Sequence, residues 1–145
     1  MPGNSYKDVT LSQMMLRIGR MSWKTVHARK QNSNLSNVQY KVCVVIHNTP
    51  GLSQDNIARE LGMDKSSIAK CIAKLIETGY VVRTLNPDDH REYQLKLSEK
   101  GEADVEEFVA LVNDWEKRLC DQIGPDTYST LKNLVSEMAA ICEQE

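Results

Sequence analysis

The sequence predicts a mainly α-helical (α+β) protein of six helices and one two-stranded hairpin. Apolar residues recur with helical spacing in six segments, whereas only residues 80–85 and 93–97 alternate between apolar and polar side chains. The turn signal Asn86-Pro87-Asp88 lies between these two segments and favours a hairpin. A chain of 145 residues is long enough for one domain with its own core.

Two helices are expected before the central part of the chain. The first should begin near Asp8 or Thr10 and end near Lys30, because an apolar stripe follows helical spacing there. Ser36 and Gln39 have the spacing of a capping box, which predicts the start of the second helix. Asn48-Thr49-Pro50-Gly51 should end it. The apolar stripe of the first helix comprises Leu11, Met15, Ile18, Met21, Trp23 and Val26.

The third and fourth helices are short and follow each other closely. Ser53 and Asp64 are good N-cap residues for them, and Gly62 and Gly79 are typical residues for their ends. Two helices joined by a tight glycine turn and followed by a hairpin are typical of a winged helix-turn-helix. In such a protein the second helix of the pair fits the major groove of DNA.

The last third of the chain predicts two longer helices. Ser98 should cap the fifth helix, and Pro125 should be the first residue of the sixth. The terminal helices have more apolar surface than a small winged-helix core can cover, which predicts a homodimer. The expected segments of this single compact chain are an N-terminal dimerisation helix (1–34), a winged helix-turn-helix domain (35–100) and C-terminal dimerisation helices (101–145).

Charge is distributed unevenly along the chain. The net charge of −2 arises from +6 in residues 1–52, zero in residues 53–97 and −8 in residues 98–145. Only the surface that faces DNA needs to be basic, so we expect the acidic last third to point away from DNA. There is no apolar run of about 20 residues and no secretion signal at the N-terminus, so we expect a cytoplasmic protein without a membrane partner.

The fourth helix carries most of the candidate DNA-binding residues. Helical projection places Ile68, Ile72, Leu75 and Ile76 on one side and small or basic residues on the other. Hydroxyl groups near the start of a helix can approach phosphates, and lysines can bind phosphates or guanine edges. The candidates on this helix are Lys65, Ser66, Ser67, Lys70 and Lys74.

The hairpin provides a second set of candidates. Arg91 at its tip can enter the minor groove, where the potential is most negative. His90 lies beside it, and Asp89 is expected to order the tip by accepting hydrogen bonds from backbone amides or from Arg91. Arg83, on the first strand, is a candidate for a contact with the DNA backbone.

A winged-helix module that binds another protein instead of DNA is an alternative. The acidic last third and the neutral middle segment favour it. Four cations in residues 65–83, opposed only by Glu77, favour DNA. The chain has no glycine-rich phosphate loop, nucleophile elbow or HExxH motif, so we expect neither an enzyme nor a cofactor.

The four cysteines lie on different predicted helices and form no CxxC pair, which argues against a zinc knuckle or a disulfide framework. Cys43 and His47 can share a helix face, but two ligands do not make a metal site, so we expect no metal. Cys71 lies at the border between the core face and the DNA face of the fourth helix. It is either a small core residue or a redox switch.

The region from Leu35 to Gly101 resembles the MarR-type transcriptional regulators. The most specific parts are GMDKSSIAKCIAKLIETGYVVR (residues 62–83), the Asp89-His90-Arg91 tip and the closing LSEKG (97–101). The resemblance implies a homodimer with interlocked terminal helices, recognition helices in successive major grooves of a palindromic operator, and Arg91 in the minor groove. It also implies a repressor.

Members of this family usually release DNA when a small aromatic or lipophilic ligand binds, and others respond to oxidation of a cysteine. The resemblance places Trp23, His27 and Trp115 on helices that line the family's effector cavity. These side chains either pack in the dimer core, which we favour, or bind a flat apolar ligand. Two departures are visible. Residues 8–30 contain no cysteine to match the peroxide-sensing one of the first helix, and Ala69 and Ala73 are small residues on or beside the reading face.

Overall fold

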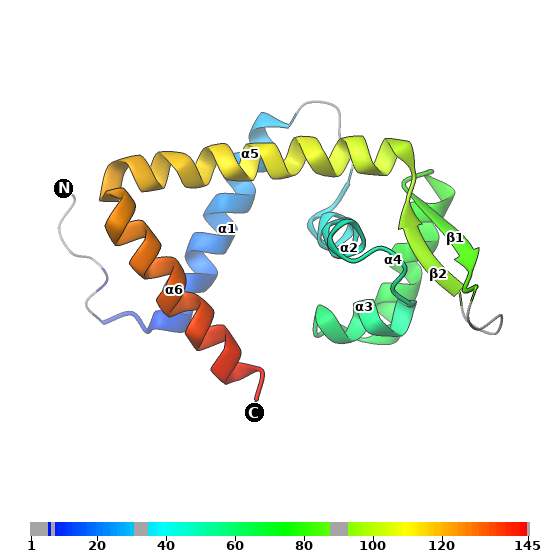
Figure 1. The fold of residues 1–145 in the computed structure, drawn as a ribbon, viewed down its shortest axis with the longest axis horizontal. Coiled ribbons are helices and arrows are strands. Elements are labelled where there is room, and N and C mark those ends of the chain that lie inside the picture. Colours follow the sequence, from blue (N-terminus) through cyan, green and yellow to red (C-terminus); the bar gives the residue numbers. More distant parts are fainter. Residues whose placement is uncertain (1–5, 7, 31–34, 88–92, 145) are drawn as a thin grey trace. The chain divides into compact units, whose positions relative to one another are not determined.

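The computed structural model describes residue 6 and residues 8–30, 35–87 and 93–144. Within them the chain forms six helices and a two-stranded antiparallel sheet, which confirms the predicted fold class (Figure 1). The chain divides into two compact units, which are described separately. Lys30–Val109 form the winged-helix unit, and Met1–Arg29 with Ala110–Glu145 form the terminal unit.

The winged-helix unit begins with α2 (Asn37–Asn48), α3 (Gln54–Glu60) and α4 (Lys65–Glu77). The N-caps predicted for these three helices are confirmed. Ser36 and Gln39 form both hydrogen bonds of a capping box, and Ser53 and Asp64 accept from the backbone amides of Asn56 and Ser67. The glycines that follow α3 and α4 have positive φ angles, of 59° and 78°. Glycine has no side chain and therefore avoids the steric cost that other residues would have in this conformation.

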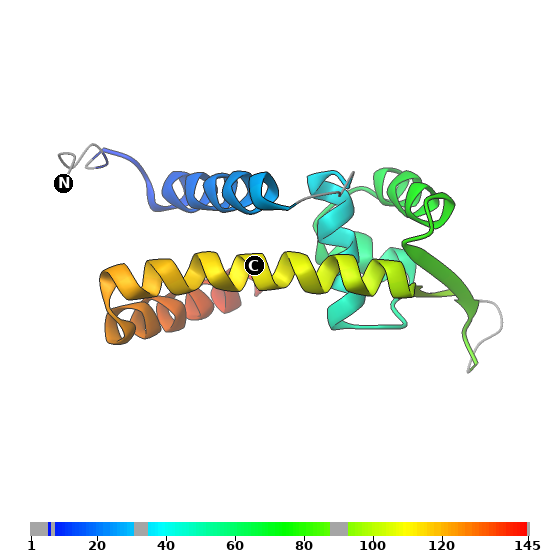
Figure 2. The same cartoon turned by 90° about the horizontal axis from the view of Figure 1, so that it is seen from above.

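The wing consists of β1 (Val81–Leu85) and β2 (Tyr93–Leu97), paired from Val81 opposite Leu97 to Leu85 opposite Tyr93. The segment between α2 and α3 lies along the other edge of β2. Gly51 donates to the carbonyl of Leu95 at 3.0 Å, and Leu95 donates to the carbonyl of Leu52 at 3.1 Å. These bonds bring the start of α3 beside the wing, which projects from the helices of this unit (Figure 2).

Aliphatic side chains from every element of this unit form its core. On α4 the predicted inward positions Ile68, Ile72 and Leu75 are fully buried, and Ile76 is half-buried. The opposite face of α4 is left for solvent or a partner. The other core side chains include Val42, Val45, Ile46, Ile57, Val81, Leu95, Leu97 and Val105.

The helix α5 (Glu99–Ile123) begins against the turn that follows α4. Ser98 donates through its hydroxyl to the carbonyl of Gly79 at 2.6 Å and accepts from the amide of Gly101 at 3.1 Å. Gly101 is packed so closely that a Cβ atom there would lie 2.2 Å from the carbonyl oxygen of Tyr80. Only glycine therefore fits at position 101, in the first turn of α5.

The buried cation of Lys30 and the side chain of Tyr40 on α2 both contact the first half of α5. The Lys30 side chain is fully buried, and its ammonium group lies 2.9 Å from Glu107 Oε2 and 3.1 Å from Asp104 Oδ1. Tyr40 donates to the other carboxylate oxygen of Asp104 at 2.9 Å and stacks on Phe108. Burial alone would lower the pKa of Lys30, but the hydrogen bonds to Glu107 and Asp104 outweigh it and raise this pKa.

Replacing Lys30 by methionine is expected to lower the free energy of unfolding by about 2 kcal/mol, because Asp104 loses its cation in a largely dry site. This loss is smaller than the roughly 3–5 kcal/mol typical of a fully buried pair, since half of the Glu107 side chain is exposed and can be rehydrated. Urea unfolding would measure it. Lys117→Met is the control, because Lys117 and Asp121 form an exposed pair. Equal behaviour of the two variants would contradict a structural role for Lys30.

The terminal unit contains α1 (Leu11–Arg29), the second part of α5 and α6 (Pro125–Cys142). Gly124 has a φ of 90° and turns the chain into α6, which begins with Pro125 as predicted. Among the described residues of α6 none is buried, and Val26 is the buried residue of α1. Large apolar side chains are therefore exposed, among them Leu11, Leu16, Ile18, Met21, Leu131, Leu134 and Ile141.

The boundaries of the units differ from the expected segments 1–34, 35–100 and 101–145, because Lys30 and the first turns of α5 belong to the winged-helix unit. The dimerisation role of residues 1–34 and 101–145 stays a prediction. No helix in the described part of the chain has the length and apolar character required to cross a membrane.

Candidate nucleic-acid interface

The outward face of α4 consists of small and basic residues. Lys65, Ser66, Lys70 and Lys74 are exposed, and Ser67 is half-buried. Because the opposite face is packed into the core, the orientation of this row is set by the burial of three aliphatic residues. A helix held in this way can present its first two turns to a groove of DNA.

Asp64 organises the start of this face. Its Oδ1 atom accepts from the amide of Ser67 at 2.8 Å and from the hydroxyl of Ser66 at 2.7 Å. Hydrogen bonds from Ser67 and Ser66 lower the pKa of Asp64 to about 2. With its proton directed to Asp64, the Ser66 hydroxyl oxygen is oriented to accept a hydrogen bond, for example from a base amino group.

The charge of Asp64 should make α4 more stable at neutral than at acid pH. A carboxylate whose pKa falls from 3.8 to about 2 on folding stabilises the folded state above pH 3.8, and this contribution disappears as the pH falls towards 2. Asp64→Asn keeps a cap acceptor but removes the charge. We expect the variant to melt at a lower temperature than the parent at pH 6, and the difference to shrink between pH 4 and pH 2. A difference that is independent of pH would contradict this assignment.

Two of the lysines on this surface are already paired with carboxylates. Lys65 lies 2.5 Å from Asp55 of α3, and Lys74 lies 2.9 Å from Glu77. Both pairs are exposed, and such pairs are weak enough for phosphate to replace the carboxylate. Lys70 has no ion pair within the described residues, and its side chain is exposed to an incoming ligand.

On the wing, Arg83 lies over the ring of Tyr93, with its central guanidinium carbon 5.3 Å from the ring centre. Residues 88–92 lie outside the described part of the chain, and they include three of the predicted DNA-binding residues, Asp89, His90 and Arg91. The roles of these three residues stay predictions from the sequence.

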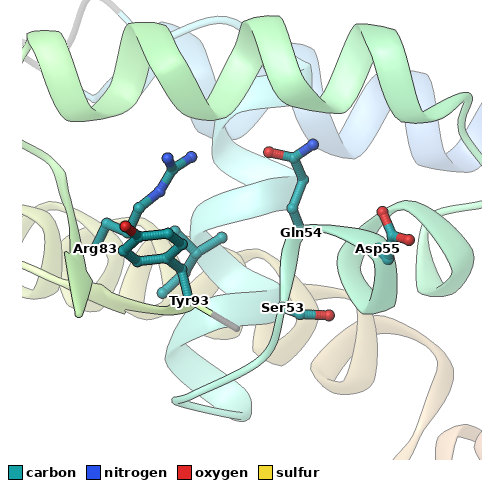
Figure 3. Close-up of a pocket in the computed structure, with 6 residues that line it drawn as sticks. Ser53, Gln54, Asp55, Arg83 and Tyr93 are labelled. Atoms are coloured by element: carbon teal, nitrogen blue, oxygen red, sulfur yellow. The ribbon is translucent and has the colours of Figure 1, made fainter. Parts of the chain in front are cut away.

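A pocket of about 320 Å³ lies between the start of α3 and the wing (Figure 3). Ser53, Gln54 and Asp55 line one side, and Arg83, Tyr93 and Leu95 line the other. Sequence reasoning identified Arg83 but missed Gln54 and Tyr93. No local pattern marks them, because they meet only through the pairing of Gly51 and Leu52 with Leu95.

Two of the four thiols, those of Cys43 and Cys71, lie where ionisation is unfavourable. Burial raises the pKa of Cys71, which is half-buried on α4, and burial with the nearby Cys71 raises the pKa of Cys43 to about 12. A peroxide sensor needs a thiolate, so these shifts oppose a redox role for Cys71. His47 Nδ1 lies 2.6 Å from Glu102 Oε2, and the described residues contain no group of three or more potential metal ligands.

The residues suggested for an effector site lie in the terminal unit. The rings of Trp23 and His27 stack on α1 with centres 5.1 Å apart. Trp115 is half-buried on α5. Aromatic surfaces of this kind suit a flat apolar ligand, but equally a packed helical interface, so the effector role of these three residues stays a prediction.

The exposed basic face of α4, held by a helix-turn-helix and followed by a hairpin, defines a winged-helix protein of the DNA-binding class. The model of the MarR family matches residues 35–93, within the winged-helix unit. The winged-helix region of the chain therefore matches the MarR family, which is a family of transcriptional regulators.

Three known proteins illustrate the similarity. The chain is 26% identical over 114 residues to the HTH-type transcriptional regulator BilQ of Clostridioides difficile, covering 77% of each chain. It is 36% identical over 99 residues to a protein described as a regulator of the hcr operon of Thauera aromatica, covering 66% of this chain but only 60% of that protein. The repressor CouR, solved bound to a 23-mer DNA duplex, is 25% identical, with a TM-score of 0.76 over 93% of this chain and 96% of CouR.

Proposed function

We propose that this regulator is a homodimeric repressor that binds a palindromic operator and releases it when a small aromatic or lipophilic ligand binds. The observation that carries the proposal is the exposed basic face of α4, whose centre, Lys70, has no carboxylate partner in the described residues. Repression follows from architecture, because a compact dimer on a promoter blocks polymerase by occupancy. A protein with this target would act in the cytoplasm.

Each predicted contact has a separate role in this proposal. Lys70 binds a guanine edge or a phosphate in the major groove, and Ser66 accepts from a base or a water molecule. Lys65 binds a phosphate with its remaining N–H donors while it stays paired with Asp55, and a phosphate takes the place of Glu77 on Lys74. Ser67 and Arg83 contact the DNA backbone. Arg91, with His90 beside it and Asp89 ordering the tip, enters the minor groove.

The terminal unit supports the homodimer part of the proposal. Its exposed leucine, isoleucine and methionine side chains would be covered by a second copy of the same surface. A two-fold dimer presents two copies of α4 about 34 Å apart, which matches half-sites one turn of DNA apart. Trp23, His27 and Trp115 are the candidate effector-binding residues.

Titrating the purified protein against its own upstream DNA at two salt concentrations tests the proposal. We expect binding that weakens steeply with salt, since each neutralised phosphate adds about 0.9 to the slope of log K against log salt. Light scattering should show two chains per particle. Failure to bind this DNA or any member of a pool of random palindromes would favour the protein-interaction alternative.

A further inference from the structure

The pocket beside α3 lies where a protein of this class meets the DNA backbone. In B-DNA one phosphate backbone strand separates a major groove from the next minor groove. A protein that puts α4 into the first groove and its wing into the second must cross that strand. The pocket lies between these two elements, because its Asp55 pairs with Lys65, the first residue of α4, while Arg83 and Tyr93 belong to the wing.

The pocket contains hydrogen-bond donors that suit an oxyanion. The side chains of Arg83 and Gln54 come from opposite sides of the pocket and point the same way (Figure 3). The negative charge of Asp55 is balanced by Lys65 at 2.5 Å. The hydroxyl of Ser53 is already engaged with Asn56 in the cap of α3. Arg83 and Gln54 are therefore the groups available for a ligand.

Tyr93 positions the guanidinium of Arg83 without occupying its hydrogen-bond donors. The central guanidinium carbon lies within cation–π distance of the Tyr93 ring, and this contact needs no N–H···O hydrogen bond, so the N–H donors remain available to an oxyanion. Within the described residues Arg83 has no carboxylate partner. A planar, fully charged group held in this way is suited to two hydrogen bonds with one phosphate.

We propose that Gln54 and Arg83 form an oxyanion subsite whose occupant is the phosphate of the backbone strand that separates the two grooves. The subsite rests on the proposed DNA-binding function and adds Gln54 as a contact residue and Tyr93 as a positioning residue. A free phosphate ion has the same chemistry, so the experiment must distinguish the two sources.

The first test compares charge changes inside and outside the pocket. Arg83→Met should reduce the salt slope of DNA binding by about two, roughly one for each protomer of the dimer, whereas Lys96→Met should not. Alternation along β2 places exposed Lys96 on the other face of the sheet from Leu95, the partner of Arg83. Gln54→Glu should weaken binding about tenfold, and Thr84→Glu, on the opposite face from Arg83, less than threefold. Gln54 is the first residue of α3, where an acidic side chain is favourable, so the variant should keep its melting temperature.

The second test identifies the occupant. Neutral methylphosphonates are placed one at a time along the operator backbone. At one position in each half-site a methylphosphonate should lower the affinity of the parent protein. The same methylphosphonate should not lower the affinity of Arg83→Met any further, because this variant no longer contacts that phosphate. Losses that add at every position would overturn the subsite.

Inorganic phosphate at constant ionic strength is the third arm of the experiment. We expect it to leave the melting temperature of the parent protein unchanged. Suppose instead that phosphate raises the melting temperature of the parent but not of Arg83→Met, and that the effects of Arg83→Met and of every methylphosphonate are additive. This result would overturn the backbone assignment in favour of a free oxyanion.

The two proposals fail differently. A parent protein that binds no DNA contradicts the proposed function, whereas a parent that binds DNA while Arg83→Met behaves like Lys96→Met contradicts only the subsite.

Discussion

Replacing Gly101 by alanine is expected to lower the free energy of unfolding by about 3 kcal/mol, the upper end for overpacking. The added Cβ atom would lie 2.2 Å from the carbonyl oxygen of Tyr80 and 3.3 Å from the Cβ of Leu97. The oxygen belongs to the backbone immediately before β1 and also accepts from the amide of Ser98. It cannot move without disturbing the start of the wing.

Gly19→Ala is the matched control for this prediction. Gly19 lies within α1, and apart from its chain neighbours and the adjacent helix backbone no described atom lies within 4 Å of an added Cβ. Alanine should therefore stabilise the helix by about 0.5–1 kcal/mol. Urea unfolding of both variants at one protein concentration would measure the difference, since association affects apparent stability. Equal changes in the two variants would contradict the close packing at Gly101.

The double substitution Lys70→Ala and Arg91→Ala is expected to weaken binding of the dimer to the operator by at least about 100-fold. Each residue is expected to make one contact per protomer, worth about 1–2 kcal/mol, and 1.4 kcal/mol corresponds to a factor of ten, so the contacts of one protomer alone account for this loss. Lys70 contributes from the exposed face of α4, and Arg91 from the wing. Fluorescence anisotropy with labelled upstream DNA would measure the loss.

Lys41→Ala combined with Lys96→Ala is the control for the DNA-binding variant. It changes the net charge by the same amount, and both lysines are exposed in the same unit. We expect it to bind within about threefold of the parent protein, because a general reduction in charge acts weakly at physiological salt. Similar losses for the two double variants would contradict specific roles for Lys70 and Arg91.

Much of the winged-helix unit could be predicted from the sequence because its signals are local. The caps at Ser36, Ser53 and Asp64 use hydrogen bonds that span only three residues. The face of α4 follows from helical periodicity, and the hairpin follows from alternation around Asn86-Pro87. Patterns that extend over only a few residues do not depend on the tertiary fold in which the helix or hairpin occurs.

Other features depend on residues that lie far apart in the chain. Lys30 was expected only as the end of a helix, yet it is paired with Asp104 and Glu107, more than 70 residues away. The raised pKa of the Cys71 thiol depends on burial, which a helical projection does not measure.

The order of the elements, their caps and the polar face of α4 could be read from the chain without any structure, since these features depend on neighbours within one or two turns. Two features follow from the tertiary structure alone: Gln54 and Arg83 line one pocket, and Gly101 has no room for a side chain. In both cases the physical reason is the same. The pairing of β2 with residues 51–52 and the packing of α5 against Tyr80 bring together segments that have no sequence pattern in common.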